Sequence, residues 1–176
     1  MERHLVGPWQ RLVAGKERVL GRAGEVEPER RGARPPAGGW SPADVIEHLV
    51  LAEGGMASAL AKAPSPAKPR KVAPGRWSRF LLLRLALKGG FRFKAPTEAI
   101  LPTRELPWHA LLSRWEEQRR GLEEWLLSVD PRILDHPRFK HPIIGWLTVP
   151  QALTFAADHL DHHFAQIDRL SRGRTV

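Results

Sequence analysis

The stretch TVPQALTFAADHLDHHFAQIDRLS, residues 148–171, contains the clearest helix in the chain. Thr148 is suited to cap its start, Pro150 stands in the first turn, and Gln151 occupies the third position of a capping box. Apolar residues then recur at intervals of three and four, at Leu153, Ala156, Leu160, Phe164 and Ile167. This spacing places them on one face of a helix. We therefore predict a helix from Thr148 to about Ser171 that packs its apolar face against other helices.

Four other segments have the same helical spacing and recognisable ends. The predicted ranges are 4–20, 41–62, 76–87 and 107–128. Gly21 is the predicted stop of the first helix, and Ser41, with Asp44 three residues later, is the predicted cap of the second. Glycines at positions 89 and 90 end the third. These helices are joined by long stretches rich in proline or glycine, which we predict to be loops, and residues 91–106 are predicted to be extended.

No segment alternates between apolar and polar residues over several positions, and the chain has no internal repeat. Helices with long connections are typical of a bundle with crossovers. The sequence thus predicts an all-α fold, a four-helix bundle with an extra short helix and long crossover loops. Residues 1–176 are expected to form a single domain.

Composition limits the kind of site that the chain can build. Its 176 residues include no cysteine, and 42% of them are hydrophobic. Disulfides, thiolate ligands and a cysteine nucleophile are excluded, so a transition metal must be held by His, Asp or Glu. The first ten residues lack the apolar core of a signal peptide, and no stretch approaches the roughly 18 apolar residues of a membrane span. We expect a cytoplasmic protein without a membrane span.

The net charge is basic, with 28 Lys and Arg against 19 Asp and Glu. Such a balance suits a nucleic acid, an anionic lipid or an anionic substrate. No helix-turn-helix, zinc finger or aromatic RNA-binding motif is present, so no nucleic-acid partner is expected. Basic residues are dense in Lys68–Lys94, which includes the predicted helix 76–87. A membrane-surface role for this helix is one interpretation; the interpretation we favour is that it lies across the bundle and covers the core.

Three of the eight histidines fall in the last predicted helix. His159 and His163 are four residues apart and differ by only about 40° around the helix axis, so both can bind the same metal ion. His163 lies at the edge of the apolar stripe and His159 slightly outside it, whereas His162 lies farther from the core. Helical geometry therefore selects His159 and His163 as the inward pair.

His48 is the natural third ligand because it borders the apolar stripe of the second predicted helix, where it faces a neighbouring helix. Three neutral imidazoles would leave coordination positions open for water or substrate, as in catalytic metal sites. The alternative is plain packing, because a histidine at a core edge is often a packing residue and an i, i+4 pair also arises by chance.

Two blocks of the sequence resemble the DinB-like superfamily, which includes the YfiT-type metal-dependent hydrolases. The first is WSPADVIEHL, residues 40–49. The second is HPIIGWLT, residues 141–148, followed by HLDHHFAQI, residues 159–167. The family's last motif is typically HP-x-x-G-x-L-T and then H-x-x-x-H-x-x-Q-I. The order and separation of the blocks also match, so the resemblance spans nearly the whole chain.

The resemblance implies an up-down-down-up four-helix bundle with a long crossover, and relatives are often homodimers. It implies a divalent metal ion (Ni, Zn, Fe or Mn) on His48, His159 and His163. Some relatives are transferases or isomerases that use a low-molecular-weight thiol, and many have no assigned reaction. Fold alone does not define function.

Two reactions on a small-molecule substrate are consistent with such a site. In hydrolysis, a metal-bound water would supply hydroxide. In transfer, the metal would ionise the thiol of a small cofactor, because the chain has no cysteine of its own. The alternative is a non-catalytic stress-response or binding protein that retains the metal site.

Metal-bound histidines usually donate their second ring N–H to an acceptor. The candidate acceptors are Glu47, Asp158, Asp161 and Gln166. Gln166 is the best placed, three residues after His163, whereas Glu47 and Asp158 each neighbour a ligand and therefore point in another direction. His162 is a candidate acid or base at the rim of the pocket. Trp40 and Trp146 flank the motifs and are predicted to pack at helix ends, with lining of the pocket as the alternative.

Overall fold

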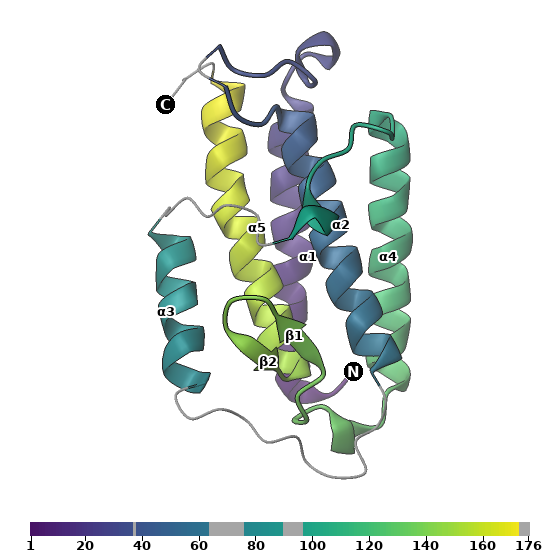
Figure 1. The fold of residues 1–176 in the computed structure, drawn as a ribbon. Helices are drawn as coiled ribbons and strands as arrows, with labels where there is room; N and C mark the ends of the chain where they lie inside the picture. The colour runs from purple at the N-terminus through teal and green to yellow at the C-terminus, as the bar shows by residue number, and fades with distance from the viewer. Residues whose placement is uncertain (37, 64–75, 90–96, 173–176) are drawn as a thin grey trace.

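The structure is a computed structural model that describes residues 1–36, 38–63, 76–89 and 97–172. Four long helices form a bundle in which they run up, down, down and up in chain order (Figure 1). They are α1 (Arg3–Gly24), α2 (Pro42–Lys62), α4 (Trp108–Ser128) and α5 (Val149–Ser171). The short helix α3 (Arg76–Lys88) lies outside the bundle, beside α5. The predicted all-α bundle with one extra short helix is confirmed.

The predicted cap of α2 and the predicted capping box of α5 are both present, and the cap of α2 is also a complete capping box. The Ser41 hydroxyl accepts a hydrogen bond from the Asp44 backbone N–H, and the Asp44 carboxylate accepts one from the Ser41 N–H. Thr148 and Gln151 exchange the same two bonds at the start of α5. Each box satisfies backbone donors that the first helical turn would otherwise leave unpaired. These local bonds fix the first residues of the two helices that carry the predicted ligands.

The predicted end of α1 at Gly21 is wrong, because the helix continues to Gly24. A glycine inside a helix costs about 1 kcal/mol relative to alanine. The apolar face of α1 continues past it, with Val19 and Ala23 both fully buried. This burial offsets the cost of Gly21 and extends the helix by one turn.

The core lies where the four long helices meet. α1 packs most extensively against α5, and α2 packs against both α4 and α5. Gly15 on α1 faces Leu160 on α5, and a Cβ at position 15 would lie only 3.0 Å from Leu160 Cδ1. The absence of a side chain at Gly15 thus allows close approach of α1 and α5 and fixes the position of α5 against the rest of the bundle.

The connection between α4 and α5 contains a small hairpin that the sequence did not predict. Strand β1 (Phe139–His141) pairs antiparallel with β2 (Gly145–Leu147), with Phe139 opposite Leu147. Each strand has only three residues, which is too short for an alternating pattern to be recognised. Gly145 adopts a positive φ of 83°, which suits glycine at the end of the turn.

Three single-turn 3₁₀ helices complete the described connections: η1 (Pro28–Arg30), η2 (Glu98–Ile100) and η3 (Pro131–Ile133). η2 falls within residues 91–106, which were predicted to be extended, so the prediction is wrong for these three residues. Residues 91–96 lie outside the described part of the chain. η2 lies against α2, and this contact becomes important at the candidate site.

α3 covers part of the core, as predicted. Phe80, Leu83 and Leu87 are buried and belong to the same hydrophobic cluster as the bundle helices. Arg84 adds an ion pair to Asp158 of α5, with an Nε–Oδ2 distance of 2.5 Å. Within the described ranges, no helix combines the length and apolar character needed to cross a bilayer.

Candidate metal centre

The three predicted ligands come together in the seam between α2 and α5. His159 Nε2 lies 3.2 Å from His48 Nε2 and 3.1 Å from His163 Nε2. One ring nitrogen of each residue lies within 4.8 Å of the others, a spacing at which all three could hold one metal ion. The i, i+4 pair on α5 and the single histidine on α2 thus produce the geometry that helical spacing predicted.

Two of the three imidazoles are oriented by hydrogen bonds on the far side of the ring. His48 Nδ1 lies 2.8 Å from the backbone oxygen of Ile100, and His163 Nδ1 lies 2.8 Å from Gln166 Oε1. Both partners are acceptors, so each Nδ1 carries the hydrogen and each Nε2 presents its lone pair to the centre. This is the arrangement in which outer partners fix the tautomer of metal-binding histidines. The prediction that Gln166 orients His163 agrees with this contact.

Burial keeps the three rings neutral. It lowers the pKa of His163 to about 3 and lowers the pKa of His48, where it outweighs the opposing bond to Ile100. The pKa of His159 falls well below its usual value because of burial and the neighbouring His163 and His48. Neutral imidazole is the form that binds a metal ion, so all three candidate ligands are in the required state at neutral pH.

The acceptor for His48 lies on a segment that α2 itself holds in place. We name residues 97–104 the strap; it includes η2 and Ile100. The Glu47 carboxylate accepts hydrogen bonds from the backbone N–H and hydroxyl of Thr103, at 2.9 and 2.7 Å, and from the backbone N–H of Arg104. Glu47 was a candidate acceptor for the N–H of a ligand histidine. It instead binds the strap, and the strap carries the acceptor for His48.

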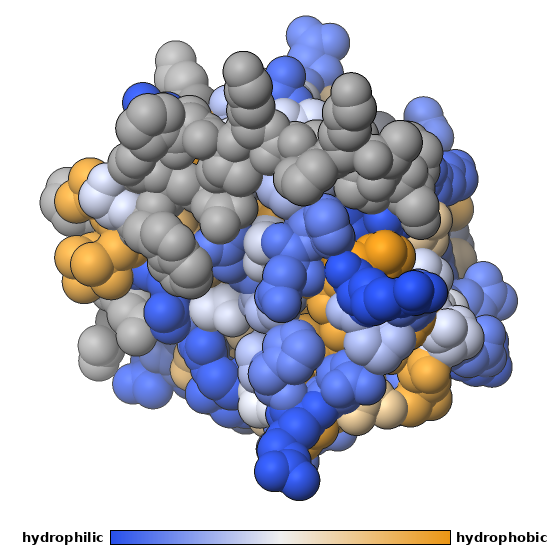
Figure 2. Space-filling model, turned by 90° about the horizontal axis from the view of Figure 1, so that it is seen from below, coloured by the Kyte–Doolittle hydropathy of each residue, from blue (hydrophilic) through white to orange (hydrophobic). Residues whose placement is uncertain are grey.

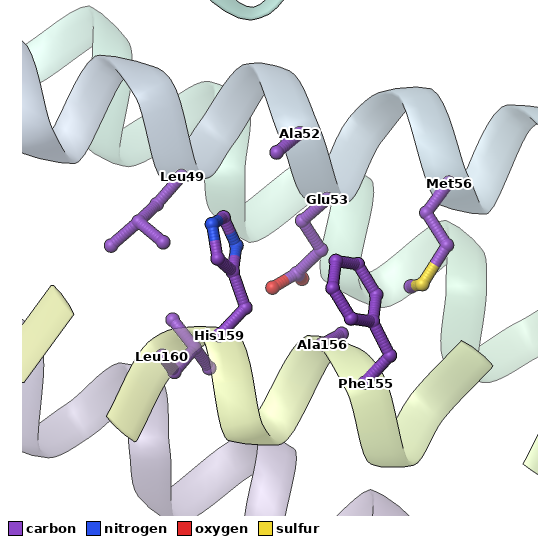
Figure 3. Close-up of a pocket in the computed structure, with 8 residues that line it drawn as sticks. All are labelled: Leu49, Ala52, Glu53, Met56, Phe155, Ala156, His159 and Leu160. Carbon is purple, nitrogen blue, oxygen red and sulfur yellow. The ribbon is translucent and has the colours of Figure 1, made fainter. Parts of the chain in front are cut away.

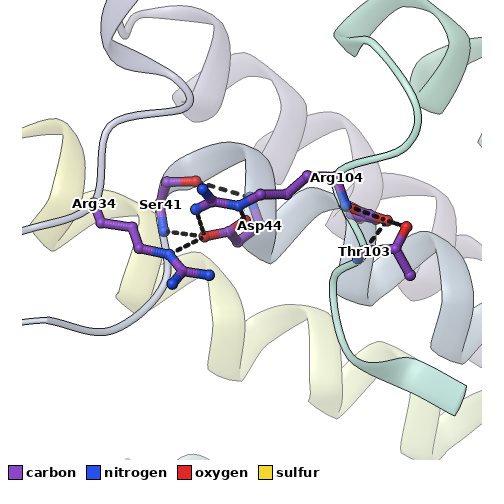
Figure 4. Close-up of polar contacts among 6 residues, drawn as sticks. Arg34, Ser41, Asp44, Thr103 and Arg104 are labelled. Atoms are coloured by element: carbon purple, nitrogen blue, oxygen red, sulfur yellow. Dashed lines mark hydrogen bonds and ion pairs between the residues drawn. The ribbon is translucent and has the colours of Figure 1, made fainter. Parts of the chain in front are cut away.

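A second acidic residue of α2 binds the same end of the strap (Figure 4). The Arg104 guanidinium donates two bonds of 2.7 Å to the Asp44 carboxylate, which also pairs with Arg34. Burial raises the pKa of Asp44, but the hydrogen bonds from Arg104, Ser41 and Arg34 outweigh it and lower the pKa to about 2. Arg104 has a positive φ of 64°, a strained conformation for a residue with a side chain. The contacts of Asp44 and Glu47 compensate for that strain.

A small pocket adjoins the histidine cluster between α2 and α5 (Figure 3). It has room for about one water-sized molecule. Its lining is mainly apolar, and the Glu53 carboxylate points into the space between the rings of His159 and Phe155. The pocket is lined by Leu49, Ala52, Glu53, Met56, Phe155, Ala156, His159 and Leu160.

Glu53 is a site residue that the sequence reasoning missed. It is buried and forms a bidentate ion pair with Arg119 of α4, at 2.6 and 2.8 Å. The available signal was its position: Glu53 follows Leu49 by four residues and precedes Met56 by three, so it interrupts the apolar stripe of α2. A carboxylate inside an apolar stripe needs a buried partner or a functional role.

Comparison with protein families matches residues 11–167 to the DinB superfamily. The chain belongs to the DinB superfamily. A comparison with solved structures finds the crystal structure of TT2238, described as a four-helix bundle protein, with 23% identity and a TM-score of 0.56. The match covers 92% of this chain and 96% of TT2238, and at this identity it supports the fold alone. A comparison with curated proteins gives no match.

Two acidic residues beside the ligands have other roles in this DinB-superfamily chain. Asp158, next to His159, is fully buried and pairs with Arg11 and with Arg84 of α3. Asp161 pairs with Arg11 and Arg18 on the surface. Within the described residues neither carboxylate accepts a bond from a ligand histidine, so their candidate role as acceptors is wrong. They join α1 and α3 to α5.

His162 lies outside the cluster, as helical geometry predicted. Its Nδ1 lies 3.0 Å from the backbone oxygen of Leu87, at the end of α3, and its ring centre lies 5.0 Å from that of His163. Because His162 lies at the edge of the site, its role as an acid or base stays a prediction. Its described contact is structural, because it joins α3 to α5.

Trp40 packs on the site itself as well as at a helix end. Its ring is tilted against His48, with centres 4.7 Å apart, and stacked on His163 at 6.2 Å. On the opposite side, Phe155 stacks on His159 at 5.6 Å. Trp146 lies in the hairpin, opposite Lys140. Aromatic rings thus flank the three imidazoles and restrict their motion.

The donor set fits a divalent transition metal. Three neutral nitrogen ligands suit zinc, nickel and iron better than calcium or magnesium, which prefer oxygen ligands. The three Nε2 atoms converge on one point. Ile100 and Gln166 accept hydrogen bonds from the Nδ1 atoms of His48 and His163 and so hold these two rings toward that point.

Proposed function

We propose that this chain is a metal-dependent enzyme of the DinB superfamily that holds a divalent ion on His48, His159 and His163. The observation that carries the proposal is the convergence of one ring nitrogen from each of three neutral imidazoles beside a pocket. Three histidine ligands leave coordination positions for other molecules, which is typical of catalytic rather than structural sites. Nickel, zinc, iron and manganese are the candidate ions.

A bound ion of this kind acts as a Lewis acid and lowers the pKa of a water or thiol that it binds. The protein residues contribute orientation and a controlled environment. Ile100 and Gln166 hold His48 and His163 in the metal-binding tautomer. The apolar lining of the pocket excludes bulk water, which strengthens electrostatic interactions inside it. Glu53 places one carboxylate in this apolar lining, where two hydrogen bonds from Arg119 hold it in position.

Hydrolysis of a small molecule is the reaction that the described residues favour. The pocket beside His159 has room for about one water-sized molecule, and water is the co-substrate of hydrolysis. A thiol cofactor with carboxylates would also need free cationic partners. Arg84, Arg104 and Arg119, on the elements around the site, are each paired with a carboxylate of the chain. Transfer of a low-molecular-weight thiol is therefore the second candidate reaction.

Metal content of the purified protein tests the proposal first. The wild type and the His159→Ala/His163→Ala variant are stripped of metal, reloaded with each candidate ion and analysed for bound metal. We expect close to one ion per chain in the wild type and far less in the variant. His162→Ala is the matched control, because it removes a histidine of the same helix from outside the cluster. Equal metal content in the wild type and the double variant would refute the proposed site.

Activity assays then separate the two reactions. Metal-loaded protein is incubated with panels of esters, amides and electrophiles, with and without low-molecular-weight thiols. Turnover without thiol supports hydrolysis, whereas turnover only with a thiol supports transfer. A protein that binds one ion and turns over none of these panels would favour the non-catalytic alternative, a binding or stress-response protein that retains its site.

A further inference from the structure

The basic charge of the chain is concentrated in the segment of sequence that contains α3. Between Glu53 and Glu98 the sequence contains ten Lys or Arg residues and no Asp or Glu. The rest of the chain therefore carries 18 of the 28 basic residues against all 19 acidic residues and is close to neutral. One segment of 44 residues thus accounts for the whole net charge of +9. Such a concentration attracts an anionic partner.

α3 has two apolar faces, and the bundle uses only one of them. Phe80, Leu83 and Leu87 are buried against the core. Leu81, Leu82 and Leu85 lie on the other side of the helix and are 55%, 64% and 57% exposed. They are spaced i, i+1 and i+4, so they form one patch, which we name the leucine patch. Seen from below, hydrophobic residues reach the surface beside hydrophilic ones on the side of the molecule where α3 lies (Figure 2).

The leucine patch has a fixed orientation. The ion pair between Arg84 and the buried Asp158 and the contact of the Leu87 carbonyl with His162 both join α3 to α5. These contacts lie on the inner side of α3. Because α3 is fixed to α5, its three exposed leucines point away from the bundle, as they must in a helix that inserts into another surface.

We propose that α3 docks this protein on an anionic lipid surface, with the leucine patch entering the boundary between headgroups and acyl chains. Exposed leucines within a segment of sequence that has ten basic residues and no acidic ones combine the two attractions by which amphipathic helices bind membranes. Nucleic acid would satisfy the basic residues but would offer nothing to three leucines. A second copy of the chain would cover the leucines but would bring two strongly basic segments together. The lipid surface is the partner that complements both features, and it is independent of the reaction at the metal centre.

Vesicle binding of the full-length chain tests this proposal. The protein is floated with vesicles of phosphatidylcholine alone or with 30% phosphatidylglycerol, at 0.1 M and 0.5 M NaCl. We expect binding to the anionic vesicles at least tenfold tighter than to the neutral ones, and weaker binding at the higher salt because surface charges are screened. The Leu81→Ser/Leu82→Ser/Leu85→Ser variant should lose at least tenfold in affinity. Leu127→Ser is the matched control, because Leu127 is 60% exposed but lies on α4.

Circular dichroism and thermal unfolding establish that the variants remain folded, and Arg79→Glu provides a second variant with the leucines intact. Arg79 is exposed on α3, so its reversal should weaken binding to anionic vesicles alone. Several outcomes would overturn the proposal. These are no preference for anionic vesicles, equal binding by the triple serine variant, and a wild-type dimer that the triple variant converts to a monomer without any vesicle binding. Binding to a DNA duplex that the triple variant retains in full, with no vesicle binding, would assign the surface to nucleic acid instead.

Discussion

The buried ion pair between Glu53 and Arg119 allows a quantitative test of the structure. Both side chains are nearly inaccessible, with 5% and 7% exposed, and two hydrogen bonds of 2.8 and 2.6 Å join them across α2 and α4. The Arg119 guanidinium also lies over the ring of Trp9 on α1, 5.6 Å from its centre. One pair therefore connects three of the four bundle helices. Removing a single partner leaves the other charge buried without compensation.

We expect Glu53→Leu and Arg119→Met each to lower the free energy of unfolding by roughly 3–5 kcal/mol, the usual cost of breaking a buried ion pair. For a domain of this size, that corresponds to a decrease in Tm on the order of 10 °C. The double variant Glu53→Leu/Arg119→Met removes both charges and replaces them by apolar groups. Its unfolding free energy should return to within about 1–2 kcal/mol of the wild type. The coupling between the two positions is then several kcal/mol.

Urea denaturation of the four proteins, followed by circular dichroism, provides the measurement. Arg132→Met is the control, because Arg132 is 89% exposed and an ion pair so open to solvent should contribute little to the free energy of unfolding. Single variants within about 1 kcal/mol of the wild type, or additive effects in the double variant, would refute the description of this pair as buried and coupled.

Three further predictions follow from the site and its supports. Gln166→Leu removes the acceptor of His163 and should weaken metal binding by roughly 10–100-fold in a competition titration, with little change in fold, whereas unchanged affinity would exclude a role for that bond. The pKa of Asp44 falls from 3.8 to about 2 on folding, so its contribution is complete above about pH 4 and is lost as the pH falls through about 2. Asp44→Asn should therefore reduce the difference in unfolding free energy between pH 6 and pH 2 by roughly 2 kcal/mol, and an unaltered pH dependence would contradict the pairing with Arg104. Ser41→Ala removes an N-cap and should cost about 1 kcal/mol in urea denaturation; a cost near zero would mean that the capping box does not hold the start of α2.

Features of the fold with a local cause were predictable from the sequence. The starts of α2 and α5 follow from capping boxes of four residues each, and the pairing of His159 with His163 follows from the pitch of a helix. The predicted end at Gly21 was wrong because the local preference of glycine was weaker than the tertiary burial of Ala23. The hairpin at Phe139–Leu147 was missed because its strands are shorter than any recognisable period.

Features that depend on contacts between distant residues were not predictable. Ile100 lies 52 residues from His48, and the bond uses a backbone carbonyl, which every residue has and which therefore carries no sequence signal. The partner of Glu53 lies 66 residues away. Glu47 was a reasonable candidate because of its place beside a ligand, but successive residues of a helix point about 100° apart. Neighbours of a ligand in the sequence are thus directed to other elements, as the contact of Glu47 with the strap illustrates.

The orientation of His48 depends on a closed set of contacts that begins and ends on α2. The ring donates to Ile100 of the strap, and the end of the strap is bound by Glu47, the residue next to His48, and by Asp44, one turn earlier. Asp44 is also the residue that completes the capping box with the first residues of α2. The start of the helix, the position of the strap and the direction of the ligand are therefore linked through two carboxylates. Because the acceptor is a backbone oxygen, no substitution at position 100 can remove it directly; the strap must be released instead. Loss of Asp44 or Glu47 should thus affect metal binding through His48 even though neither residue contacts the metal centre.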